Sequence, residues 1–149
     1  MANKNYFTPD EVNALIPRLE EHFRNFWSFR ENAQTILEEF RTGGKGPRAL
    51  AEGNEEEDPE QVALGQMRRS QAHFLLEQAK KELDVIMETG CSIKDLETGL
   101  VDFPHLLEFE EEEVYLCWKY GEKKVRFWHE LDQGFTSRKP LPRRVPNQQ

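Results

Sequence analysis

The residues best suited to chemistry lie in the last third of the chain. His129 is the sharpest candidate, because an imidazole binds metal ions or moves protons near neutral pH. A metal site around His129 would draw on Asp102, Glu122 and Asp132, which lie in the same β-rich portion. Their spacing matches no strong ligand pattern such as H-E-x-x-H or paired C-x-x-C. The spacing therefore favours a hydrogen-bonded packing role for His129 over a ligand or acid/base role.

Cys117 and Arg138 are the other residues that could take part in a site. Cys117 would be a nucleophile if the fold brought it to His129, but side chains alternate along a strand. A hairpin centred on the turn at Tyr120 to Lys123 puts Cys117 and His129 on opposite faces, which favours a structural thiol. Arg138 is expected either to bind an anion or to act as a structural clamp with Asp102, Glu122 or Asp132.

The spacing of apolar residues changes along the chain from a helical period to the alternation of strands, and this predicts the elements that position these residues. Residues 8–41 predict a long amphipathic helix, which starts at a capping box of Thr8 and Glu11. Pro17 is expected to bend this helix or to break its first two turns. Residues 42–58 read as a mobile acidic, glycine-containing loop. Residues 59–89 predict a second long helix, which Gly90 ends.

The remaining residues predict a small sheet. The range 91–137 alternates apolar and polar residues around two turns, one at Glu97 to Gly99 and one at Tyr120 to Lys123. Pro104 should restrict its segment to an edge or an end of a strand. Residues 138–149 are expected to form a loose basic tail. The whole predicts a single α+β domain, in which a long antiparallel helical hairpin packs on a small antiparallel sheet.

Composition narrows the function classes. The chain has 149 residues, is 32% charged and carries a formal net charge of −8, which disfavours nucleic acid and anionic membranes as partners. No apolar run approaches the length of a membrane span, and the first residues lack the apolar core of a signal peptide. Cys91 and Cys117 form no disulfide framework. We therefore expect a cytoplasmic protein with two free thiols.

Three stretches of the sequence resemble a known family. They are "YFTPDEVNALIPRLEEHF", "GCSIKDLETGLVDFP" and "EVYLCWKYGEKKVRFWHELDQGFTSRKPL", and together they are similar to the bacterial family called domain of unknown function 2203. The resemblance covers nearly the whole chain apart from the acidic central loop and the last few residues. It implies a bacterial, cytoplasmic protein and transfers no activity, ligand or catalytic residue.

Two functional hypotheses follow. Two helices cannot cover all their apolar and aromatic surface, which favours a non-enzymatic module that assembles into a homo-oligomer. The alternative is a protein that binds a divalent metal or a small ligand around His129, and that could be a metal-dependent enzyme. The sequence names no small-molecule ligand and no further cofactor. Nucleic-acid binding through the basic segment from Arg138 to Arg144 ranks last, because the chain is acidic overall.

Overall fold

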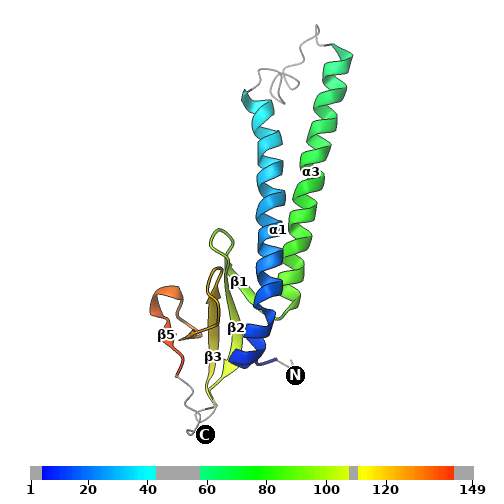
Figure 1. Cartoon of the computed structure of the whole chain (residues 1–149). Helices are drawn as coiled ribbons and strands as arrows, with labels where there is room; N and C mark the ends of the chain where they lie inside the picture. Colours follow the sequence, from blue (N-terminus) through cyan, green and yellow to red (C-terminus); the bar gives the residue numbers. More distant parts are fainter. Residues whose placement is uncertain (1–4, 43–57, 108–110, 143–149) are drawn as a thin grey trace. The chain divides into compact units, whose positions relative to one another are not determined.

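The computed structural model describes residues 5–42, 58–107 and 111–142. It contains the helices α1 (Pro9–Thr42) and α3 (Pro59–Glu88), then the strands β1 (Ser92–Asp95), β2 (Leu100–Leu106), β3 (Glu113–Lys119) and β4 (Phe127–Glu130), a short 3-10 helix η1 (Phe135–Ser137) and β5 (Lys139–Pro140) (Figure 1). The predicted α+β class, with a helical hairpin and a small antiparallel sheet, is confirmed. In the described residues no helix has the length and apolarity to span a bilayer.

The chain divides into two compact units. The sheet unit comprises Met1–Glu21 and Ile86–Gln149, and the hairpin unit comprises His22–Val85. The expectation of a single domain stays a prediction. The predicted loop from 42 to 58 lies outside the described residues except at its two ends.

The helix boundaries follow from local chemistry. The Thr8 hydroxyl accepts a hydrogen bond from the backbone N–H of Glu11 (3.1 Å), and the Glu11 carboxylate accepts one from the N–H of Thr8 (2.9 Å), which confirms the predicted capping box. Of the two outcomes expected at Pro17, a bend or a break of the first two turns, the break is wrong, because α1 runs on through Pro17. Gly90 follows α3 at a φ of +110°, which an L side chain rarely adopts.

The hairpin unit is held by apolar contacts and a small polar cluster. Phe23 stacks on Trp27 with ring centroids 5.5 Å apart. Glu82 of α3 accepts hydrogen bonds from two α1 side chains, His22 (3.3 Å) and Asn25 (2.6 Å). The buried apolar side chains of this unit come from both helices and include Phe23, Phe26, Ala33, Ala72 and Ala79. The two helices therefore form the predicted hairpin.

The sheet has the strand order β1-β2-β3-β4-β5, and every pair of neighbours is antiparallel. Pro104 lies in β2 beyond Asp102, the last β2 residue that pairs with β1. Its missing N–H therefore breaks no bond of that ladder. Lys139 and Pro140, which were expected in a loose tail, instead form β5 beside β4; residues 143–149 lie outside the described residues.

One face of the sheet is covered by the start of α1. Phe7 packs edge-on against Phe103 with ring centroids 5.0 Å apart, and the Asn13 side chain accepts a hydrogen bond from the N–H of Val125 (2.7 Å). Phe103, Leu116 and Trp118 are fully buried. This face is an ordinary apolar core, so the side chains that could do chemistry lie on the opposite face.

Candidate metal centre

The hairpin of β3 and β4 has a different register from the predicted one. Cys117 pairs with Phe127, and Tyr115 pairs with His129. Paired residues share a face of the sheet, so the prediction that Cys117 and His129 lie on opposite faces is wrong. An odd number of residues, 118 to 126, separates Cys117 from Phe127, whereas the predicted registers leave an even number. The chain turns at Gly121, and pairing resumes only at Phe127. Because the number of intervening residues is odd, the side chains of β4 lie on the opposite face from the one predicted.

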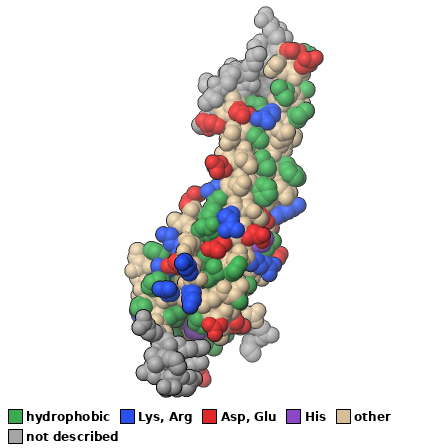
Figure 2. Space-filling view, viewed as in Figure 1, with side chains coloured by type: hydrophobic (Ala, Val, Ile, Leu, Met, Phe, Trp, Pro, Cys, Tyr) green, Lys and Arg blue, Asp and Glu red, His purple; other side chains and the backbone are tan. Residues whose placement is uncertain are grey.

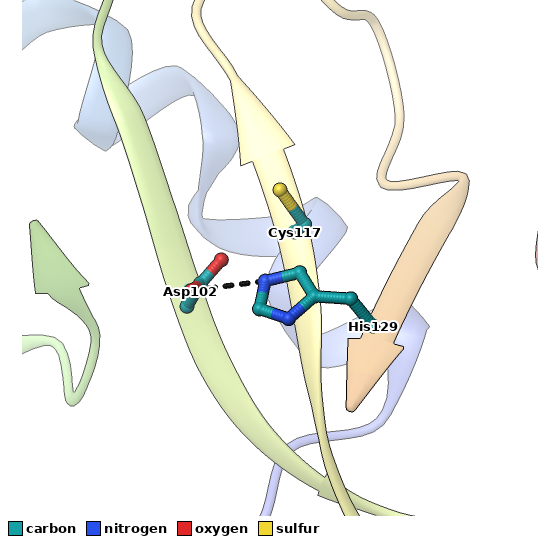
Figure 3. Close-up of side chains that lie close together, drawn as sticks. All are labelled: Asp102, Cys117 and His129. Carbon is teal, nitrogen blue, oxygen red and sulfur yellow. Dashed lines mark hydrogen bonds and ion pairs between the residues drawn. The ribbon is translucent and has the colours of Figure 1, made fainter. Parts of the chain in front are cut away.

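Asp102, Cys117 and His129 come together on this second face (Figure 3). Asp102 of β2 pairs directly with Cys117 of β3, and His129 reaches in from β4. One ligand atom from each side chain, a carboxylate oxygen, the sulfur and an imidazole nitrogen, lies within 4.8 Å of the other two. All three side chains are buried: Asp102 is 2% exposed, His129 1% and Cys117 0%.

The hydrogen bonds of His129 define which of its nitrogens can act as a ligand. Nδ1 lies 2.8 Å from the backbone carbonyl of Glu130, which can only accept, so Nδ1 carries a proton. In a neutral imidazole, Nε2 then holds a lone pair and points at Asp102 Oδ2, 3.1 Å away. At that distance either a proton or a metal ion lies between the two atoms, and the proton would belong to an imidazolium or to a carboxylic acid. A histidine that donates Nδ1–H to a carbonyl and offers Nε2 is the arrangement usual for metal ligands.

Asp102 has one carboxylate oxygen to spare. Oδ2 faces His129, while Oδ1 is buried and accepts no hydrogen bond from the described residues. A buried carboxylate oxygen without a partner is costly. A proton between Asp102 and His129 would satisfy only Oδ2. A metal ion could engage both carboxylate oxygens together with the neighbouring sulfur and nitrogen.

Cys117 is a poor nucleophile in this environment. Burial raises the pKa of its thiol to about 12, and the negative charge of Asp102 acts in the same direction, while Arg138 opposes them. The metal-free thiol is therefore neutral at pH 7, which argues against the nucleophilic role considered from the sequence. A coordinated metal deprotonates a thiol outright, so the raised pKa is compatible with a ligand role.

Arg138 closes the edge of this cluster. Its Nη1 donates to both oxygens of the Glu122 carboxylate (3.3 and 3.1 Å) and lies 3.9 Å from the sulfur of Cys117. Its guanidinium carbon is 4.1 Å from the ring centroids of both Phe127 and Phe135. Among the two roles expected for Arg138, the structure displays the clamp, with Glu122 as its partner.

The four residues expected around a metal are thus divided. Asp102 and His129 lie together, Glu122 pairs with Arg138, and Asp132 is exposed in the turn after β4. Cys117 takes the place expected of a further carboxylate. Cys117 would have been predicted as a ligand from a hairpin register with an odd number of residues between paired positions, because that register puts Cys117 and His129 on one face.

Comparison with known proteins finds one family whose model matches almost all of the described chain. The model of the family described as "Uncharacterized conserved protein (DUF2203)" matches residues 5–141. The chain belongs to the DUF2203 family. The match includes all the strands and the three clustered residues. Among curated proteins and among solved structures, no match to this DUF2203 chain is found.

The charges of the cluster in this DUF2203 protein suit a divalent ion. A carboxylate from Asp102, a thiolate from Cys117 and a neutral imidazole from His129 sum to two negative charges. A divalent cation would make the buried centre neutral, which is the least costly state in a medium of low polarity. Sulfur, nitrogen and oxygen donors together are the set that zinc accepts in proteins.

Proposed function

We propose that this protein binds one divalent transition-metal ion, with zinc as the best fit, through Asp102, Cys117 and His129. The observation that carries the proposal is the buried cluster, in which ligand atoms of Asp102, Cys117 and His129 lie within 4.8 Å of one another beside a carboxylate oxygen, Asp102 Oδ1, that accepts no hydrogen bond from the described residues. Ligand atoms of a tetrahedral zinc ion lie about 3.5 Å apart, so small side-chain movements bring this cluster to coordinating distance.

The burial of the ligands favours a structural centre, whereas their number, three, is typical of catalytic zinc sites. Structural zinc sites are closed, with four donor atoms, whereas catalytic sites keep an open position. Asp102, Cys117 and His129 supply three protein ligands, and the two oxygens of one carboxylate lie too close together to fill two tetrahedral positions, so a water molecule or another small ligand would complete the coordination. The ion would tie β2, β3 and β4 to one another. Thiolate ligation also needs reduced cysteine, which fits the two free thiols and supports the cytoplasmic location inferred from the sequence.

The test is metal analysis of the untagged protein purified without chelators. We expect close to one zinc ion per chain, lost in Cys117→Ser and in His129→Gln. Cys91→Ser and His105→Gln are matched controls, because both residues belong to the sheet unit but not to the cluster. Both controls should retain the metal.

A spectroscopic measurement on the wild-type protein does not depend on how the variants fold. Replacing the ion with cobalt should produce a thiolate-to-cobalt charge-transfer absorption. Wild-type protein that takes up neither zinc nor cobalt would overturn the proposal. So would a folded Cys117→Ser variant that binds cobalt with the same absorption as the wild type.

A second candidate function, a homo-oligomeric assembly module, has support in the hairpin unit. Several large apolar side chains of α3 are exposed, including Leu64 (49%), Met67 (57%) and Phe74 (61%). Exposed apolar residues grouped on one helix are typical of interaction surfaces. Light scattering across a wide concentration range tests this function, and a strict monomer would contradict it.

A further inference from the structure

The exposed side chains of α3 follow a seven-residue repeat. Glu60, Met67, Phe74 and Lys81 are spaced by seven, and all four are exposed. Residues seven apart on a helix lie on nearly the same side. Leu64 and Gln71 lie beside this row at the alternate spacing of three and four. We call this row, from Glu60 to Lys81, the α3 stripe; it is apolar in its middle, acidic at one end and basic at the other.

The middle of the α3 stripe borders a groove in the hairpin unit. The groove is lined by Ile36 of α1 and by Met67, Ser70, Gln71, Phe74 and Leu75 of α3. Hydrophobic side chains lie on the visible surface of the helical hairpin in Figure 2. An apolar row beside a shallow groove is the arrangement into which another helix packs.

We infer that the occupant is the α3 stripe of a second copy of this chain, packed antiparallel about a two-fold axis between Ser70 and Gln71. In this register residue numbers of opposing positions sum to 141. Met67 then lies opposite Phe74 of the partner subunit, which makes a sulfur–aromatic contact twice across the axis. The inference rests on the assembly function proposed above and adds its surface and register.

Charge decides the direction of packing. The antiparallel register puts Glu60 opposite Lys81 of the partner subunit at both ends of the stripe, so each end carries an attractive pair. A parallel arrangement would put Glu60 opposite Glu60 of the partner subunit and Lys81 opposite Lys81 of the partner subunit. Like charges directly across a helix pair are unfavourable, and pairs of opposite charge at such flanking positions set the orientation of paired helices.

The first experiment is sedimentation equilibrium of the full chain from low to high micromolar concentration. Phe74→Gln should weaken dimerisation by about tenfold or more, because it removes the central apolar residue twice. Leu76→Gln is the matched control: Leu76 is also exposed on α3 (41%) but lies off the stripe. It should change dimerisation by less than about threefold. A monomeric wild type would overturn both the assembly function and this inference.

Charge reversal then tests the register on its own. Glu60→Lys alone and Lys81→Glu alone each create like charges at both ends of the stripe and should weaken the dimer. The double variant Glu60→Lys with Lys81→Glu restores opposite charges and should recover the wild-type affinity. A dimer that survives either single change, or that the double change fails to restore, would overturn the register while leaving the assembly function standing.

Discussion

The sheet unit and the hairpin unit depart from the usual distribution of side chains in opposite ways. The sheet unit buries an acid and a histidine, Asp102 and His129, beside a cysteine, whereas the hairpin unit exposes Met67 and Phe74. A buried polar group is costly unless it is hydrogen-bonded or paired, and large exposed apolar side chains grouped on one helix are typical of interaction surfaces. The two proposals accordingly assign a different partner to each unit: an ion to the sheet unit and a second copy of the chain to the hairpin unit.

The largest difference is expected when a phenylalanine is replaced by alanine in each of the two units. Phe103→Ala removes a fully buried ring from the sheet and should lower the free energy of unfolding by about 3–5 kcal/mol. Phe74→Ala removes a ring that is 61% exposed and should cost less than about 1 kcal/mol in dilute protein. Denaturant unfolding of both variants measures the difference. Equal costs would mean that Phe74 is buried in solution.

The contribution of Asp102 and His129 to stability can be measured without any bound metal if a chelator is present. Asp102→Ala and His129→Ala should each cost about 3 kcal/mol, because each leaves the other polar group buried without its partner. The double variant should cost less than the sum, with a coupling of about 1–3 kcal/mol. A double-mutant cycle by denaturant unfolding measures it. Simple additivity would show that the two side chains are not paired.

The pH dependence of stability provides a third test, on the other buried thiol of the sheet unit. Burial raises the pKa of Cys91 from 9.0 to about 11. Above pH 9 the unfolded chain releases this proton while the folded chain keeps it, so stability falls as the pH rises towards 11. The loss is at most about 2–3 kcal/mol. Cys91→Ala should lose less stability than the wild type between pH 8 and pH 11, and parallel profiles would contradict the prediction.

The smallest change in the free energy of unfolding is expected when each of two arginine–glutamate ion pairs is broken. Glu122→Gln removes the charge that holds Arg138, whose side chain is only 12% exposed, and should cost about 1 kcal/mol. Arg68 and Glu39 form an ion pair in the hairpin unit with 33% and 55% of their side chains exposed. Glu39→Gln should therefore cost less than about 0.5 kcal/mol. Unfolding at low and high salt measures both, and an equal loss in the two variants would contradict the comparison.

The sequence by itself determined the elements of this protein. The capping box at Thr8, the glycine that ends α3 at Gly90 and the alternation within β3 are local signals, because they depend on residues a few positions apart. They predicted both helices, the turns and the α+β class. They also singled out Asp102 and His129 among the candidate ligands and Glu122 as one partner for Arg138.

Only the tertiary structure decided which candidates meet. Whether Cys117 faces His129 depends on whether the β3–β4 connection leaves an odd or an even number of residues between paired positions. Turn propensities do not resolve a difference of one residue, although that difference moves every side chain to the other face. Asp102 comes from β2, and its pairing with Cys117 is a long-range contact that no local pattern encodes. The candidate metal centre is therefore a product of strand register.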